Sequence, residues 1–222
     1  MNLYSFITYA GLGMVLVFGS VRTVSACPPA AGAVQWRSLD GGNGHWYLRV
    51  GTPTAPAQLG WDAARAAAEA MGGHLVTITS AAENAFVQPM LIDGYFNVYL
   101  LGGYRVGSEW HWVTGEPWDY TNWYGGEPNN ANGNEYYLAS WVTPGTWNDV
   151  WSTYEGSGYI VEWDAANGCA GDINEDCAIN GIDLAYVLAD WGTISSRSDL
   201  NGDGTISGID LGIILNGWGA CP

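Results

Sequence analysis

The sequence predicts an α+β domain followed by a small, separate all-α module. Two helix patterns, at residues 61–71 and 81–87, precede a long region of short strands and turns, which is typical of an α+β fold. Residues 172–219 contain an internal repeat, in which Asp199 follows its counterpart Asp172 by 27 residues. The chain has 222 residues, which is enough for one or two domains.

The composition favours a folded chain and argues against several functions. Hydrophobic residues make up 48% of the sequence, and 13 Trp and 13 Tyr residues supply a large area to bury. The 6 basic residues, all Arg, face 22 carboxylates, and the net charge is −16. Because phosphate groups would repel such a chain, we expect no nucleic-acid partner and no adhesion to anionic membranes. The acidity suits a divalent cation such as Ca²⁺, which prefers oxygen ligands.

Residues 1–26 are predicted to be a signal peptide. The stretch 3–19 is apolar and uncharged, and residues 24–26 fit a signal-peptidase site. One alternative is a short membrane anchor, for which the stretch is marginal. The other is a lipid anchor on Cys27, because residues 24–27 resemble a lipobox. Secretion is preferred, so we expect a secreted or cell-surface protein with no membrane insertion after signal cleavage.

The first domain is predicted over residues 44–164. A strand signal at residues 45–50 opens it, and an Ala-rich helix at residues 61–71 follows. The glycine pair that begins at Gly72 ends this helix.

The remaining elements follow the same order along the chain. A short strand is predicted at residues 74–78, and Ser80 then caps the second helix, with Glu83 in the capping-box position. From residue 98 to 163, short runs rich in Trp, Tyr and Val alternate with Gly and Pro turns, which indicates antiparallel strands. Residues 165–171 are interpreted as a linker to the repeat.

The repeat has the ligand spacing of an EF-hand loop. Each copy carries oxygen-bearing side chains at loop positions 1, 3, 5 and 12, and a backbone carbonyl is available at position 7. The first copy supplies Asp172, Asn174, Asp176, Ala178 and Asp183. The second copy supplies Asp199, Asn201, Asp203, Thr205 and Asp210. Two such loops in register predict up to two Ca²⁺ ions in this module.

The repeat pair resembles dockerin type I repeats, in which one helix follows each loop. This resemblance implies a small EF-hand-like module and a possible cohesin-type protein partner. The alternative is a sorting or stabilising tail. Cys177 departs from the pattern, because it stands where the sharp turn wants Gly. Export makes disulfides possible, and four cysteines allow three pairings. Cys169–Cys221 is preferred, since paired repeats bring the ends of the module together, and Cys27 and Cys177 are then left over.

A second group of oxygen-bearing side chains lies in the first domain. They occupy Gly- and Asn-rich loops within residues 127–149. The group consists of Glu127, Asn129, Glu135, Asn148 and Asp149. Such a gathering indicates a calcium site that is exposed at a loop surface.

These motifs, and the order of elements over residues 44–164, resemble the C-type lectin domain. The resemblance implies a fold of two helices with loop-rich antiparallel sheets, a cis Glu-Pro bond, and one Ca²⁺ held by all five side chains. A single ion is expected because Tyr136 stands where an acid often supports an auxiliary ion. The Glu-Pro-Asn form implies a mannose-, glucose- or fucose-type sugar. The residues implied to bind its hydroxyls are Glu127, Asn129, Glu135 and Asn148.

The domain departs from that family in its cysteines. The family usually has two internal disulfides, whereas residues 28–168 contain no cysteine. We therefore expect tryptophan packing to take the place of these disulfides.

No catalytic residue is predicted. His45, His74 and His111 are isolated in the sequence, and no Ser has the context of a nucleophile elbow. Carboxylate pairs that could serve a glycosidase are already assigned to calcium. We therefore expect an exported bacterial lectin that binds a glycan through calcium and is not an enzyme. The alternative is a protein-binding adhesin that uses the lectin fold with a structural calcium site and no sugar ligand.

Overall fold

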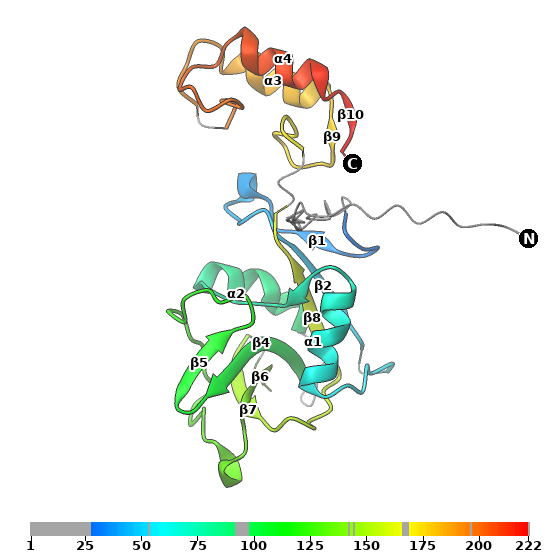
Figure 1. The fold of residues 1–222 in the computed structure, drawn as a ribbon, viewed down its shortest axis with the longest axis vertical. Coiled ribbons are helices and arrows are strands. Elements are labelled where there is room, and N and C mark those ends of the chain that lie inside the picture. Colours follow the sequence, from blue (N-terminus) through cyan, green and yellow to red (C-terminus); the bar gives the residue numbers. More distant parts are fainter. Residues whose placement is uncertain are drawn as a thin grey trace, which may run out of the picture.

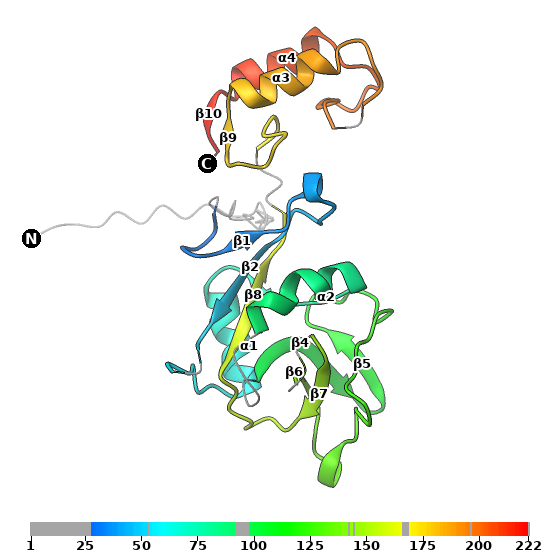
Figure 2. The same cartoon turned by 180° about the vertical axis from the view of Figure 1, so that it is seen from behind.

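A computed structural model describes residues 28–52, 54–91, 98–141, 143, 145–165, 169–195 and 197–221. The expected signal peptide and Cys27 lie outside these residues. Figures 1 and 2 show a sheet domain and a pair of helices as two bodies that the chain between β8 and β9 connects. Within the described part of the chain, no helix has the length and apolar character needed to cross a membrane.

The described residues of the first domain form one sheet of eight strands. Its path is β1-β2-β8-β4-β6-β7, and β3 pairs with β8 while β5 pairs with β4. The strands are β1 (Val34–Gln35), β2 (Trp46–Val50), β3 (His74–Leu75), β4 (Tyr99–Val106), β5 (Glu109–Trp112), β6 (Tyr137–Ser140), β7 (Trp147–Val150) and β8 (Gly158–Trp163). Antiparallel pairing of β2 with β8 sets Trp46 opposite Trp163, so the two ends of the domain lie side by side.

Two helices pack on this sheet, and three short 3₁₀ helices punctuate the loops. Helix α1 (Trp61–Ala70) buries Trp61, Ala64 and Ala68, which share one helical face. Helix α2 (Ala81–Val87) begins as predicted, because the Ser80 hydroxyl accepts the N–H of Glu83 at 3.1 Å. The 3₁₀ helices are η1 (Ser38–Asp40), η2 (Gln88–Leu91) and η3 (Ala131–Gly133).

Tryptophan packing fills the core, as the sequence predicts. Trp61, Trp112, Trp147 and Trp163 are buried to 2% exposure or less. Trp112 and Trp147 meet edge to face with ring centroids 5.7 Å apart, and Trp118 contacts both. Large aromatic rings bury much area and prefer such geometries. They provide the cohesion of a domain that has no internal disulfide.

A buried polar network joins β2, β3, β8 and α2. Glu162, only 1% exposed, lies 2.6 Å from Nδ1 of His45 and accepts the backbone N–H of Thr77 at 2.8 Å. Burial lowers the pKa of His74, but a hydrogen bond to Asp164 and the negative charge of Glu162 outweigh it and raise that pKa to about 9. The hydrogen bond to Glu162 likewise outweighs burial and raises the pKa of His45. In their charged form these imidazoles stabilise the buried carboxylate.

The C-terminal module places one helix after each loop. These are α3 (Gly181–Ala189) and α4 (Gly208–Asn216), and both begin with a capping box. A two-residue ladder of β9 (Ala178–Ile179) with β10 (Gly219–Ala220) joins the first loop to the end of the module. The small core consists of Ile173, Ile179, Val187, Ile206 and Ile214.

One predicted disulfide is present and one expectation about cysteines is wrong. Cys169 and Cys221 are bonded, with their Cα atoms 5.6 Å apart and 52 residues between them in sequence. The predicted pairing is thereby confirmed. Cys177 was expected to be left over, but it also takes part in a disulfide.

The polar network predicts a pH-dependent stability of the first domain. Because the folded-state pKa of His74 is raised to about 9, its charged form stabilises the fold fully below about pH 6.5 and ceases to do so as the pH rises through about 9. The melting temperature, followed by near-ultraviolet circular dichroism, should fall between pH 6 and pH 9.5. The fall should be smaller in His74→Gln, whereas His111→Gln, on β5 opposite Tyr104, should keep it. An equal fall in both variants would contradict the assignment.

Candidate functional site

The predicted calcium residues of the first domain come from two segments. Glu127 and Asn129 precede η3, Glu135 follows it, and Asn148 and Asp149 lie on β7. In Figure 1, the loop that carries η3 projects from the end of the domain farthest from α3 and α4. The segment that sequence reasoning singled out is therefore a loop surface, held on one side by a buried strand.

Asp149 fastens the two segments together. Its side chain is fully buried, and its Oδ1 and Oδ2 accept the backbone N–H groups of Asn129 at 3.0 Å and Asn130 at 2.9 Å. Glu127, half-buried beside them, also accepts the N–H of Asn129 at 3.1 Å. The Glu127–Pro128 bond is cis, as the resemblance implies. The Glu-Pro-Asn turn is thus held against β7 by a carboxylate.

Glu135 closes the η3 loop from the other side. It is 4% exposed, and its Oε2 accepts the N–H of Ala131 at 2.7 Å. Its own N–H donates to Oδ1 of Asn130 at 3.1 Å. Asn130 and Asn132 have φ of +47° and +57°, in the left-handed region that Asn tolerates better than most residues. The many Asn and Gly residues of this loop are therefore explained by its backbone.

The electrostatics of the site call for a cation. Burial and the charge of Asp149 raise the pKa of Glu127, and burial with the charges of Asp149 and Glu127 raises the pKa of Glu135. Oδ1 of Asn148 is buried and has no hydrogen-bond partner among the described residues. A buried acceptor without a donor costs about 1–3 kcal/mol. Three carboxylates and this amide oxygen offer only oxygen donors, which is the ligand type that Ca²⁺ prefers.

Hydrogen bonds therefore join three of the five predicted residues directly, namely Glu127, Asn129 and Asp149. Asn130 links Glu135 to Asp149, and Asn148 is the neighbour of Asp149 on β7. Their roles as ligands stay predictions. Sequence reasoning missed Arg105, whose Nη2 donates to the main-chain oxygen of Glu135 at 2.8 Å. A signal was present, because Arg105 is the only Lys or Arg between residues 66 and 196.

The two loops of the C-terminal module share one hydrogen-bond pattern. Asp172 accepts the backbone N–H groups of the residues four and five positions later, at 3.0 and 2.8 Å. Asp199 accepts the equivalent pair in the second loop at 3.1 and 2.8 Å. At position 3, Asn174 and Asn201 each donate from Nδ2 to the position-5 aspartate at 2.8 Å. The first-position carboxylate thus folds each loop around the positions predicted to bind metal.

The position-12 residues lie inside the module. Asp183 and Asp210 are fully buried, and each accepts a backbone N–H from the second residue of its own loop, at 2.7 and 2.9 Å. Each also accepts the N–H of the residue that caps the following helix, at 2.8 Å. One carboxylate therefore links the start of each loop to the helix after it.

The loops differ where their backbone turns most sharply. The second loop has Gly202 and Gly204 at φ of +74° and +86°, which glycine adopts without strain. The first loop has Glu175 and Cys177 at +57° and +73°. Non-glycine residues in the left-handed region cost roughly 1–2 kcal/mol each. Sequence reasoning found the departure at Cys177 but missed the one at Glu175.

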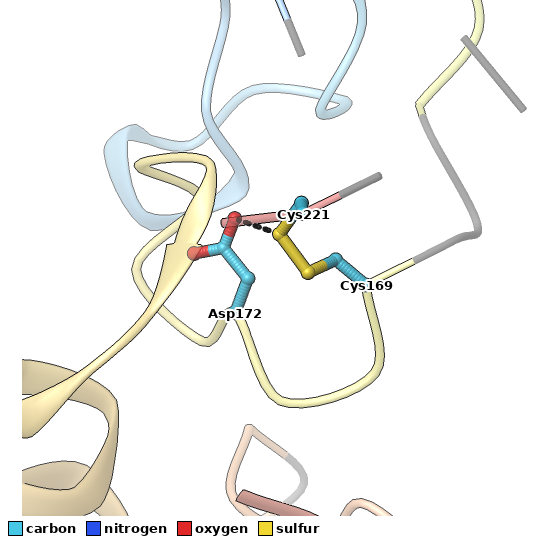
Figure 3. A group of neighbouring side chains, drawn as sticks. All are labelled: Cys169, Asp172 and Cys221. Atoms are coloured by element: carbon cyan, nitrogen blue, oxygen red, sulfur yellow. Dashed lines mark hydrogen bonds between the residues drawn. A yellow bond between two sulfur atoms is a disulfide. The ribbon is translucent and has the colours of Figure 1, made fainter. Parts of the chain in front are cut away.

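Figure 3 shows what fastens the first loop at its base. Asp172, the first-position carboxylate, points at the Cys169–Cys221 disulfide, and its Oδ2 lies 3.6 Å from Cys221 Sγ. The two sulfurs are bonded to each other and so are not metal ligands. Burial and the charges of Asp183 and Asp176 raise the pKa of Asp172. The disulfide holds this loop while its carboxylates repel one another.

Comparisons with known proteins agree with both modules. The Lectin C-type domain model matches residues 57–157, and the Dockerin type I domain model matches residues 170–218. The hepatic lectin of Gallus gallus is 35% identical over 58% of this chain, which spans 58% of that lectin. The perlucin-like protein of Mytilus galloprovincialis is 34% identical over 48% of this chain and 71% of its own length.

A solved structure supports the same assignment. The cow C-type carbohydrate-recognition domain of CD23, crystallised in the presence of a GlcNAc2Man3 oligosaccharide, matches with 25% identity and a TM-score of 0.52. The match covers 61% of this chain and 95% of that domain. Family model, relatives and fold agree, and the chain belongs to the C-type lectin family, with a dockerin type I domain after its lectin domain.

Proposed function

We propose that the protein is a calcium-dependent lectin whose first domain, residues 44–164, binds one Ca²⁺ and a glycan. The observation that carries the proposal is the buried Oδ1 of Asn148, which has no hydrogen-bond partner among the described residues. Its neighbour Asp149 shares the N–H of Asn129 with Glu127, so two carboxylates meet at one backbone group. Ca²⁺ would neutralise the repulsion between the carboxylates and give the orphaned oxygen a partner. The lectin fold of the domain and its lectin relatives support this function.

Sugar recognition follows from hydrogen-bonding capacity. Two neighbouring hydroxyls of a sugar would bind Ca²⁺, donate their protons to Glu127 and Glu135, and accept from the amide groups of Asn129 and Asn148. Charged acceptors make the stronger hydrogen bonds. Mannose-, glucose- or fucose-type sugars are the proposed class. Because the site is a loop surface, a single site should bind weakly, on the order of millimolar, or about −4 kcal/mol.

No enzymatic activity is proposed. The carboxylates that could act as acid and base are the ones assigned to calcium, and relatives and fold are those of lectins. Export through the signal peptide of residues 1–26 to the outside or the surface of a bacterial cell also stays a proposal, since the relatives named above are animal proteins.

The dockerin module, residues 172–219 after a linker at residues 165–171, is proposed to bind up to two Ca²⁺ and to dock onto a cohesin-type protein. Six of its exposed apolar residues form pairs related by the repeat, and each of the six is 47–58% exposed. The pairs are Ile182 with Ile209, Leu188 with Leu215, and Trp191 with Trp218. This arrangement gives α3 and α4 equivalent surfaces, either of which could meet the same partner.

The calcium-dependent lectin can be tested by affinity chromatography on immobilised mannose. The wild type should be retained in calcium and released by chelator. Asp149→Ala should lose calcium and sugar together, weakening calcium binding about tenfold or more, since a proposed charged ligand disappears and the N–H groups of Asn129 and Asn130 lose their acceptors. The exposed Asp119→Ala should behave as wild type. A wild type that binds calcium normally and ignores mannose, glucose and fucose would favour the protein-binding adhesin.

Sugar choice should depend on the order of donor and acceptor around the calcium. The double variant Glu127→Gln with Asn129→Asp exchanges an acceptor and a donor while keeping the size of both side chains. The sugar hydroxyls must then turn to match, so specificity should move from mannose-type towards galactose-type sugars, with calcium still required. A glycan array run with and without chelator measures the change. Unchanged mannose preference in the double variant would refute this recognition scheme.

Cohesin docking predicts a redundancy between the repeats. Ile182→Asp alone should weaken binding little, because α4 still presents Ile209, whereas Ile182→Asp with Ile209→Asp should abolish it. A pull-down with immobilised cohesin domains measures both. Ile194→Asp is the matched control, since Ile194 is 85% exposed and lies outside the paired set. If the wild type is retained by no cohesin, the module is a tail.

A further inference from the structure

Arg105 stands beside the proposed calcium site although its charge has the sign of the metal. It lies on β4, whose edge meets the chain leading into β6, and its N–H donates to the main-chain oxygen of Tyr136 at 2.8 Å. This backbone hydrogen bond places the half-buried Arg105 side chain beside the segment that begins with Glu135. There the guanidinium Nη2 donates to the Glu135 carbonyl at 2.8 Å.

The guanidinium is fixed in this position by an aromatic ring. Its central carbon lies 5.1 Å from the centroid of the Tyr136 ring, within the range of a cation–π contact. The Tyr136 hydroxyl in turn donates to the Gly133 carbonyl at 2.9 Å, at the end of η3. The Nε of Arg105 is buried and has no hydrogen-bond partner among the described residues. Glu135 and Tyr136 are therefore the contacts that hold the guanidinium.

These contacts leave little freedom to Glu135. Its N–H is held by Asn130, its carboxylate by the N–H of Ala131, and its carbonyl by Arg105. Asp149 and Glu127 repel this carboxylate, and the charge of Arg105 offsets part of that repulsion. Arg105 is thus a fixed positive charge that acts on Glu135 whether or not a metal is bound.

We propose that Arg105 is a positioning residue of the lectin site, whose guanidinium holds Glu135 in its binding geometry before calcium arrives. This inference rests on the proposed calcium-dependent lectin function. A guanidinium makes a planar, directional contact with both the carbonyl and the ring, which the ammonium of Lys does not reproduce. The guanidinium of Arg105, which belongs to the protein itself, therefore orders the η3 loop before any metal binds.

The direction in which calcium affinity changes on neutralising Arg105 distinguishes positioning from simple charge repulsion. If Arg105 acted only as a charge near the metal, its repulsion of Ca²⁺ would weaken binding, and neutralising it would tighten calcium binding. If it acts by positioning Glu135, neutralising it releases the loop and weakens calcium binding. The two accounts predict opposite changes in one measured constant.

The test uses the full-length, ¹⁵N-labelled protein and titrates calcium while following the amide resonances of Glu135 and Asn148. These signals report the first domain separately from the dockerin loops. Arg105→Met keeps an apolar stem without the charge, and its calcium dissociation constant should rise about tenfold, as expected for one lost charged hydrogen bond. Arg105→Lys should recover part of this loss. Arg65→Met, which removes an equal charge from the exposed ion pair with Glu69 on α1, should leave the constant unchanged.

Two readouts separate positioning from general damage to the fold. The melting temperature in chelator should differ little between wild type and Arg105→Met, and mannose binding at saturating calcium should be recovered. If Arg105→Met melts far lower, Tyr136→Leu decides instead, in comparison with Tyr136→Phe. Both variants lose the hydroxyl bond to Gly133 and only Leu loses the ring that Arg105 faces, so Leu should weaken calcium binding further. Unchanged or tighter calcium binding in the deciding variant overturns the proposal while the lectin function stands. A wild type without calcium-dependent shifts at Glu135 and Asn148 overturns both.

Discussion

The proposed binding face of the first domain depends on one buried carboxylate. Asp149 sits in a strand with no exposed surface, where an uncompensated charge would be very costly. Its two oxygens accept the N–H groups of Asn129 and Asn130. If the loop moved away from the strand, the buried carboxylate would lose both hydrogen bonds. The Asp149 carboxylate is buried and can find its hydrogen-bond donors only in this loop, so it fixes the position of the Glu-Pro-Asn turn. The other features of the site, from the η3 turn to the aim of Glu135, are arranged around that attachment.

The chain has many carboxylates and no lysine, and the negative charge is compensated in three different ways. In the core, imidazoles compensate Glu162, and the pKa of His74 rises to about 9 as a result. At the lectin loop, one arginine faces Glu135. In the dockerin loops no basic side chain contacts Asp172 or Asp199 within the described residues, and backbone N–H groups take that role. The first two devices hold without metal. In the third, backbone dipoles face several full charges, which suits a module that completes its folding with calcium.

Local signals in the sequence were enough for the helices and for much of the site. The Ser80 cap, the glycine pair after α1 and the 27-residue repeat each act within a few residues, and each appears where the pattern places it. The strand expected over residues 74–78 shortens to β3 (His74–Leu75), because Val76 leaves the ladder and binds Ile160 and Gly102 through separate backbone contacts. Arg105 was not foreseen, since its position is set by the register between β4 and the chain before β6, and sheet register is a long-range property. The strain at Glu175 had a signal that was missed, because the 27-residue register sets Glu175 opposite Gly202, whose φ is positive.

The position of the two ends of the first domain has a consequence for multivalent binding by several copies of the protein. Because β2 and β8 are neighbours, the chain enters and leaves the domain at one end, and the η3 loop projects from the other end (Figures 1 and 2). A partner that binds α3 and α4 would leave the proposed sugar-binding loop facing outward. Many copies held in this way along one scaffold would present a row of weak sites to a surface that carries many glycans. Linked weak sites gain about 10²–10⁴-fold in apparent affinity when the geometry lets them engage together. The architecture thus suits the proposed lectin function in a multivalent form, in which affinity for a surface comes from the number of sites engaged.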